Sequence, residues 1–318
     1  MDKLGIYIPT YNRPDELGEC LNSFIPQLRP FGFPIYISDN STDDKTEKMV
    51  MKIKKRYPRI YYRKNAYMKY GRIYATNLKS VLEMGNTEFV WFFSDDDAIK
   101  KNAISTIVNN LFGVEFLMVN WDGWSKDLKK KISTPRKEYE DTGIDYHSAL
   151  TFINGQNYKT HMAHAILKKN ILIREIKNLK IRSCGLDFLH TILFYRGISD
   201  FRCNGKFISK PIFKYRIENI EYSNRILDIF FRSWDITHDM LEGYYSNLAI
   251  KKSRKRDIRT LILLLIMDKN RNNERKLEEY LIYTYLLKIN LFYKLVLLCC
   301  DFIPKFVVRY SAGLRHTI

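Results

Sequence analysis

The sequence contains few cysteines and no long hydrophobic run. Its five cysteines are odd in number and show no Cys-x-x-Cys spacing, so neither a disulfide framework nor a zinc site is indicated, and a reducing compartment fits best. The apolar runs near the C-terminus are shorter than the ~20 residues that span a bilayer. The first residues, MDKLGIYIPTYNR, lack the basic and then apolar pattern of a signal peptide, so we expect a cytoplasmic protein.

Acidic residues are scarce relative to basic ones. The chain has 53 Lys and Arg against 35 Asp and Glu, a net charge of +18. This excess suits an anionic partner, which includes nucleic acid, an anionic membrane and phosphorylated small molecules. Surface lysine that only keeps the protein soluble is the alternative. No helix-turn-helix, RRM or zinc module is recognisable, so we expect no nucleic-acid partner.

The first hundred residues alternate short apolar runs with helical patterns. The predicted strands are residues 4–10, 33–41, 59–65 and 87–93. This alternation predicts an α/β fold with a Rossmann-like, mostly parallel central sheet flanked by helices. In such sheets ligands bind at the carboxyl ends of the strands. Three polar clusters are therefore expected at one edge: Thr10 to Arg13, Asp39 to Ser41, and Asp95 to Asp97.

Three consecutive aspartates follow the fourth predicted strand. Their carboxylates repel one another, so at least one pKa rises unless a cation or a donor lies nearby. Mg²⁺ or Mn²⁺ is one solution, because each takes few carboxylates and completes its shell with water and phosphate oxygens. In an extended segment Asp95 and Asp97 point the same way while Asp96 points elsewhere. The alternative is a solvated loop in which Asp97 caps a helix that starts at Ala98.

Three segments together resemble a known family. They are IYIPTYNRPDELGECLNSF, IYISDNSTDDKTEKMV and GRIYATNLKSVLEMGNTEFVWFFSDDDAI, in strict order over roughly the first hundred residues. They resemble the family 2 glycosyltransferases of the GT-A fold. Within that family they are most similar to the bacterial, abequosyltransferase-like enzymes that build surface polysaccharides.

The resemblance implies a nucleotide-sugar site and a divalent metal. Asp39 would accept a hydrogen bond from the edge of the base. Asp95 would point toward the ribose or the metal and Asp97 directly at the metal, Mn²⁺ or Mg²⁺, which would neutralise the diphosphate leaving group. The implied nucleotide-binding residues are Pro9, Thr10, Tyr11, Arg13, Asp39, Asn40, Arg72, Asn77, Asp95 and Asp96, and the implied metal ligands are Asp95 and Asp97.

An inverting transfer also needs a carboxylate that takes the proton from the acceptor hydroxyl. The resemblance places this base at a helix start after the aspartates, where RSCGLDFLHTILFYRG supplies Asp187. The alternative is that Asp187 is only an acid at a helix N-terminus. His161 and His164 are interpreted as structural histidines rather than as metal ligands. Arg216, at the end of a basic run, either contacts a phosphate or is solvated.

The C-terminal segment is basic and apolar. Residues 251 to 318 hold fifteen Lys and Arg and six Asp and Glu, so half of the net charge lies there. A broad apolar helical face beside the stretch KKSRKRDIR suits an anionic membrane surface. Cover for the sheet domain and pairing with another subunit are the alternatives. We therefore expect a nucleotide-sugar-binding half (1–115), an acceptor-binding half with the base (116–222) and a helical, basic C-terminal region (223–318).

These features predict an inverting, metal-dependent glycosyltransferase. Its donor would be a UDP-, dTDP-, CDP- or GDP-sugar and its acceptor a polyprenyl-linked saccharide, in bacterial lipopolysaccharide, capsule or O-antigen synthesis at the inner face of the plasma membrane. A nucleotidyltransferase acting on sugar phosphates is one alternative, but IPTYNRPDE lacks its glycine-rich phosphate loop. A basic nucleic-acid-binding protein is the other, and three acids at the sheet edge argue against it. Nothing in the sequence indicates an oligomeric state.

Overall fold

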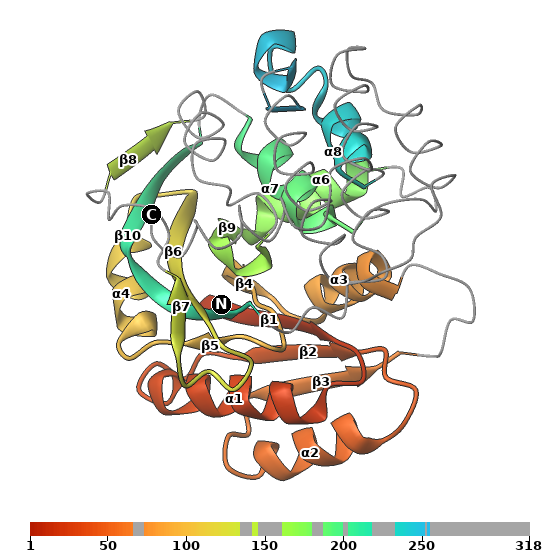
Figure 1. Cartoon of the computed structure of the whole chain (residues 1–318), viewed down its shortest axis with the longest axis vertical. Coiled ribbons are helices and arrows are strands. Elements are labelled where there is room, and N and C mark those ends of the chain that lie inside the picture. Colours follow the sequence, from red (N-terminus) through yellow and green to blue (C-terminus); the bar gives the residue numbers. More distant parts are fainter. Residues whose placement is uncertain are drawn as a thin grey trace, which may run out of the picture. The chain divides into compact units, whose positions relative to one another are not determined.

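A computed structural model of the chain describes residues 1–65, 73–133, 142–145, 161–179, 187–199, 203–217, 233–251 and 253–254 (Figure 1). The chain forms two compact units, residues 1–220 and 221–318. Some of the sequence predictions concern residues outside the described ranges. These are Arg72, the glycine before Asp187 and the segment after Arg254.

The N-terminal part of the first unit alternates strands and helices, as predicted. The elements are β1 (Asp2–Thr10), α1 (Pro14–Leu28), β2 (Ile35–Asp39), α2 (Lys45–Lys54), β3 (Ile60–Lys64), α3 (Ile73–Met84) and β4 (Thr87–Phe92). Strands β1 and β2 are buried over nearly all of their length, which is typical of parallel strands covered on both faces. Helix α1 begins at Pro14 and has two acids in its first turn, both of which favour a helix start.

The order of these strands places a ligand site between β1 and β4. The order is β3-β2-β1-β4, and all four strands are parallel. The chain runs outward from β1 to β3 and then returns through α3 to the other side of β1. The strand order therefore reverses between β1 and β4, which is where open α/β sheets bind their ligands. Gly85 allows the tight connection from α3 to β4, because a Cβ atom there would lie 2.3 Å from the ring of Tyr36.

After β4 the sheet becomes mixed. The elements are β5 (Ala98–Ile99), α4 (Ala103–Asn110), β6 (Phe116–Trp124), β7 (Lys131–Ser133), β8 (Thr142–Asp145), a 3-10 helix (Met162–His164), β9 (Ala165–Lys168), α6 (Lys169–Asn178), α7 (Leu189–Ile198) and β10 (Asn204–Arg216). Strand β9 lies antiparallel between β4 and β6, and β10 runs parallel to β6. The α/β prediction is confirmed, with the parallel strands concentrated in the first hundred residues.

Two segments differ from the sequence interpretation. Asp97 does not cap a helix, because the next residues form β5, which pairs with β10, and α4 begins only at Ala103. The basic run that ends at Arg216 is a long strand, β10, rather than a solvated segment. Pro211 falls where the β10–β6 register shifts, between Ile208 and Phe213, so its missing N–H does not break a regular ladder.

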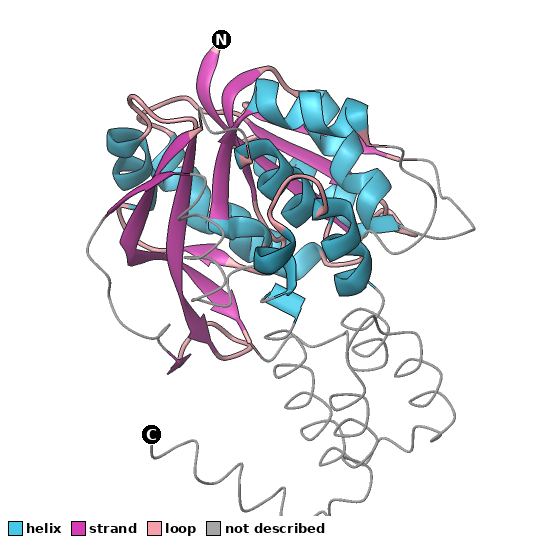
Figure 2. Ribbon diagram, turned by 90° about the horizontal axis from the view of Figure 1, so that it is seen from above, coloured by secondary structure: helices cyan, strands magenta, loops and turns pink. Residues whose placement is uncertain are grey.

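Helices cover both faces of the sheet. Helices α1, α2 and α4 lie on one face, and α3, α6 and α7 lie on the other (Figure 1). Figure 2 shows the strands between these helices in a second view. The core beneath α1 and α4 contains Phe24, Trp91 and Phe93, whose rings contact one another edge to face.

The second unit contributes the short helix α8 (Trp234–Leu241) to the described residues. His238 Nε2 lies 3.0 Å from Ser253 Oγ, and Arg254 pairs with Asp239 at 2.6 Å and with Glu242 at 3.2 Å. At least one cation of the basic stretch is therefore neutralised within its own unit. Among the helices that the structure describes, none is both long enough and apolar enough to cross a membrane.

Candidate active site

The site begins where β1 and β4 end side by side. Thr10, the last residue of β1, donates its hydroxyl to Asp95 Oδ2 at 2.7 Å. Cys20 of α1 donates its thiol to the carbonyl of Ser94, which holds the chain just before Asp95 against the helix. The two strand ends that the sequence predicts at one edge are thus joined by a direct hydrogen bond at the point where the strand order reverses.

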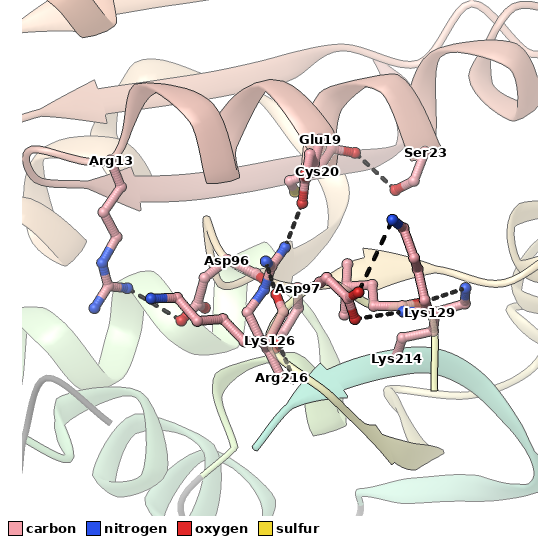
Figure 3. Close-up of polar contacts among 12 residues, drawn as sticks. Arg13, Glu19, Cys20, Ser23, Asp96, Asp97, Lys126, Lys129, Lys214 and Arg216 are labelled. Carbon is pink, nitrogen blue, oxygen red and sulfur yellow. Dashed lines mark hydrogen bonds and ion pairs between the residues drawn. The ribbon is translucent and has the colours of Figure 1, made fainter. Parts of the chain in front are cut away.

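Arg13 pairs with two of the three aspartates. Its Nη1 lies 3.1 Å from Asp95 Oδ1 and 3.2 Å from Asp96 Oδ2 (Figure 3). Burial nevertheless raises the pKa of Asp95 to about 6, with Arg13 opposing the rise and the charge of Asp96 adding to it. The same burial, together with the three carboxylates, raises the pKa of the Cys20 thiol well above its usual value, so this cysteine is not a nucleophile.

Asp97 is held by Arg216. Its Oδ1 accepts the backbone N–H of Arg216 at 2.9 Å, and the side chain is 1% exposed. Burial raises its pKa well above the usual value, the neighbouring carboxylates add to the rise, and Arg216 opposes it. Asp95 has both carboxylate oxygens in hydrogen bonds, whereas within the described residues Asp97 has a hydrogen bond to Oδ1 alone.

The end of β2 forms the second part of the site. Asp39 is fully buried, and its carboxylate accepts the Ser41 N–H at 2.7 Å and the Tyr62 hydroxyl at 2.6 Å. The Asn12 N–H donates to Ser41 Oγ, which links the loop after β1 to the loop after β2. Tyr62 was not predicted, although it lies on β3, next to the strand that carries Asp39.

An amide network lies behind these strand ends. Asn65 Nδ2 donates to Ser38 Oγ at 2.8 Å and to Asn40 Oδ1 at 2.6 Å, and Asn77 Nδ2 donates to the Thr10 carbonyl at 3.0 Å. Asn77 is 3% exposed, so its role at this edge is to hold the end of β1 in place. Asn65 was not predicted, yet it directly follows β3, so the carboxyl-end rule that located Asp39 and Asp95 also locates it.

The other predicted residues lie at or near this edge. Pro9 pairs with Ser38 within the sheet and is buried, whereas Tyr11 is 38% exposed just beyond β1. Asp187 lies in the turn two residues before α7, and it is partly buried. The first turn of α7 contacts α3 through His190 Nδ1 and the Tyr74 hydroxyl, which lie 2.5 Å apart. Because Asn77 of the same α3 contacts Thr10, the start of α7 is linked to the carboxyl end of β1 through one helix.

The two histidines form a separate aromatic group. The His161 ring contacts the rings of Trp121 and Tyr215 at centroid distances of 4.5 Å and 4.1 Å. His164 is buried against Phe194, and burial lowers its pKa to about 4. Burial lowers the pKa of His161 to about 3, so neither ring is charged near neutral pH.

The donor set fits a hard divalent cation. Over the described residues, no three His, Cys, Asp or Glu side chains are grouped as a ready-made cage. Mg²⁺ and Mn²⁺ sites of nucleotide enzymes do not need one, because water and phosphate oxygens complete their shells. Within the described residues the second oxygen of Asp97 accepts no hydrogen bond, and each oxygen of Asp95 accepts one and keeps a further lone pair.

Buried carboxylates and amides gather where the strand order of a partly parallel sheet reverses, which is the usual ligand-binding position of an α/β protein. The sequence model of Glycosyl transferase family 2 matches residues 5–176, more than half of the chain. The chain therefore belongs to glycosyltransferase family 2 and is a glycosyltransferase.

Two curated relatives are bacterial glycosyltransferases. The chain is 23% identical over 269 residues to abequosyltransferase RfbV of Salmonella typhimurium, a match that covers 79% of this chain and 78% of the relative. It is 33% identical over 109 residues to the GalNAc(5)-diNAcBac-PP-undecaprenol beta-1,3-glucosyltransferase of Campylobacter jejuni, a match that covers 34% of each chain. The predicted resemblance to family 2, including its abequosyltransferase-like members, is confirmed.

Solved structures show that the fold is GT-A. TarS 1-349 of S. aureus in complex with UDP-GlcNAc superimposes with a TM-score of 0.60 at 14% identity, covering 89% of this chain and 79% of that one. The mannosyltransferase PcManGT of Pyrobaculum calidifontis, solved with GDP-Man and Mn²⁺, gives a TM-score of 0.52 at 12% identity, covering 94% and 86%.

Proposed function

We propose that the protein is an inverting glycosyltransferase that moves a sugar from a nucleoside-diphosphate donor to a lipid-linked saccharide in bacterial surface polysaccharide synthesis. One observation carries this proposal: the hydrogen bond from Thr10 to Asp95 joins two strand-end clusters at the reversal point of the sheet. The names of the relatives support the substrate classes, since one acts on an undecaprenol-diphosphate-linked saccharide and a structural neighbour binds UDP-GlcNAc. In this proposal residues 1–115 bind the donor and residues 116–222 bind the acceptor.

The donor nucleotide would lie along the ends of β1 and β2. Asp39 is held rigidly by Tyr62 and Ser41, and each carboxylate oxygen has a further lone pair for the edge of a base. Tyr11 and Arg13, in the loop after β1, would flank the base and the ribose. Asn40 and Asn77 would keep this edge in place through Asn65 and Thr10.

Asp97 and Asp95 would hold a divalent cation, Mn²⁺ or Mg²⁺. When bound, the cation would supply positive charge to the diphosphate as the sugar leaves. In the structure Arg13 pairs with Asp95 and Asp96, and the Arg216 guanidinium lies near Asp97. The second oxygen of Asp97 would be the one that binds a hard cation. Asp187, linked to the donor edge through α7 and α3, would accept the proton from the acceptor hydroxyl.

Calorimetric titration of UDP, GDP, CDP and dTDP, each with Mn²⁺ and with EDTA, tests the donor site. We expect one of the four to bind only with Mn²⁺, and we expect Asp97→Ala to abolish that binding. Asp44→Ala is a matched control, because Asp44 is an exposed aspartate that pairs with Lys48 on α2. Equal binding in EDTA, or unchanged binding by Asp97→Ala, would remove the metal from the proposal.

We further propose that the C-terminal region binds the inner face of the plasma membrane, where a polyprenyl-linked acceptor resides. The excess of Lys and Arg in residues 251–318 supports this location. In flotation with vesicles that contain anionic lipid, the full chain should float and a chain ending at residue 250 should not. Full-length protein that stays at the bottom of the gradient would overturn the membrane proposal and leave the donor site unaffected.

A further inference from the structure

Arg216 has more contacts to the acidic loop than any sequence pattern indicates. It is the last residue of β10, and its side chain is 5% exposed. Its backbone N–H donates to Asp97 Oδ1 at 2.9 Å, and its Nε donates to the Asp96 carbonyl at 2.7 Å. One residue therefore holds both a side chain and a backbone group of the loop that follows β4.

The rest of the guanidinium is anchored on two other segments. Nη2 lies 2.6 Å from Glu19 Oε2 of α1, and Nη1 donates to the Lys126 carbonyl in the turn between β6 and β7 (Figure 3). The planar fork of arginine suits such a set of divergent acceptors, because its donors point in fixed directions. Each of the three guanidinium nitrogens thus has a protein acceptor, and these contacts use three of its five N–H donors.

These contacts span the chain. Asp97 and Arg216 are 119 residues apart, and the Glu19–Arg216 pair joins residues 197 apart. A buried guanidinium with one exposed carboxylate partner also places positive charge beside Asp97, where two more carboxylates lie. The same contacts therefore orient the loop and offset its negative charge.

We propose that Arg216 is the positioning residue for the metal site, holding Asp97 and the Asp96 carbonyl in the geometry in which the cation binds. This proposal rests on the metal-dependent donor site proposed above. Partners that orient metal ligands typically affect metal affinity 10–100-fold. The N–H to Asp97 comes from the backbone and is kept in Arg216→Gln and Arg216→Lys. The proposal therefore assigns this effect to the side chain that fixes the end of β10 against the loop.

The test measures the Kd of Mn²⁺ from the electron paramagnetic resonance of free Mn²⁺, with excess UDP, GDP, CDP or dTDP in parallel samples. We expect Arg216→Gln to raise that Kd about 10–100-fold, and we expect Arg216→Lys to recover part of the loss. Lys206→Gln is the matched control, because it removes one charge from an exposed position of the same strand. It should leave the Kd unchanged.

Melting of the metal-free protein separates a structural role from a positioning role. A purely structural Arg216 would lower the melting temperature of Arg216→Gln but leave the Mn²⁺ Kd of the folded protein unchanged, and that result would overturn the proposal. If Arg216→Gln does not fold, Glu19→Gln decides, since it removes one exposed anchor and should raise the Kd by a smaller factor. Wild-type protein that binds no Mn²⁺ with any nucleotide would overturn the metal-dependent donor site proposed above, on which this inference rests.

Discussion

At the scale of single residues, Asp187 is the residue proposed as the base. It precedes α7 by two residues and is partly buried. The first turn of that helix contacts α3 through His190 and Tyr74. A base must lie within hydrogen-bond reach of the acceptor hydroxyl while the donor is bound nearby, and the link through α3 to Thr10 supports the proposed role.

Substitution of Asp187 by Asn distinguishes a catalytic base from an acid that only stabilises the start of α7. Asn keeps the size of the side chain and its capacity to accept hydrogen bonds, but it cannot take a proton near neutral pH. We expect Asp187→Asn to lose about 10²–10⁴-fold in turnover while Mn²⁺-dependent nucleotide binding is retained. The measurement is release of nucleoside diphosphate from the sugar nucleotide when a lipid-linked saccharide is added, beside a titration of the same sample. Turnover within a few-fold of wild type would exclude Asp187 as the base.

The residues that the sequence predicts and those that it misses differ in one respect. Thr10, Asp39 and Asp95 each end or follow a strand, so the strand pattern alone places them at one edge. Asn65 obeys the same rule, since it ends the third predicted strand (59–65), but it belongs to none of the three polar clusters expected at the edge. Arg216 is different, since its contact to Asp97 depends on a pairing between segments 119 residues apart that no local pattern reveals.

At the scale of elements, the pairing of β5 with β10 is the part of the sheet that the sequence pattern did not predict. The residues after Asp97 have no strong strand pattern, yet Ala98 and Ile99 are extended because they pair with Lys214 and Phe213 of β10. Such non-local hydrogen bonds override the weak local preference of a two-residue segment. The result is functional, because the extended path of β5 carries the chain from the acidic loop directly alongside the strand that ends in Arg216.

Strand β10 did carry a local signal. From Asn204 to Phe207 exposed and buried residues alternate, which is the period of a half-buried strand. The alternation then breaks at the register shift around Pro211, and the evenly spaced lysines give the segment the composition of a solvated run. The alternation of exposed and buried residues before the bulge therefore indicates the strand, whereas the overall composition of the segment does not.

At the scale of the whole molecule, buried histidines link stability to pH. Burial lowers the pKa of His164 from 6.5 to about 4. Within the described residues its Nε2 is buried without a hydrogen-bond partner, and its Nδ1 contacts the His161 carbonyl. The ring therefore remains neutral in the folded protein at a pH where it would be protonated in the unfolded chain. Asp95 acts in the opposite direction, since its raised pKa makes the folded state bind more protons between about pH 4 and pH 6.

Comparing wild type with His164→Asn isolates the contribution of this histidine to the pH dependence of stability. Above pH 6.5 His164 is neutral in both states and has no effect on the pH dependence of stability. As the pH falls from 6.5 toward 4, the unfolded chain takes up a proton that the folded chain refuses, so the free energy of unfolding decreases. With these two pKa values the loss is about 2 kcal/mol at pH 5.

His164→Asn keeps a donor near the His161 carbonyl but does not titrate, so it should lack this loss, while Asp95 contributes equally to both proteins. Urea unfolding at pH 5, 6 and 7.5 measures the effect, and we expect the stability of wild type to fall more steeply below pH 6.5 than that of His164→Asn. Parallel curves over this range would show that His164 is protonated in the folded protein as readily as in the unfolded chain.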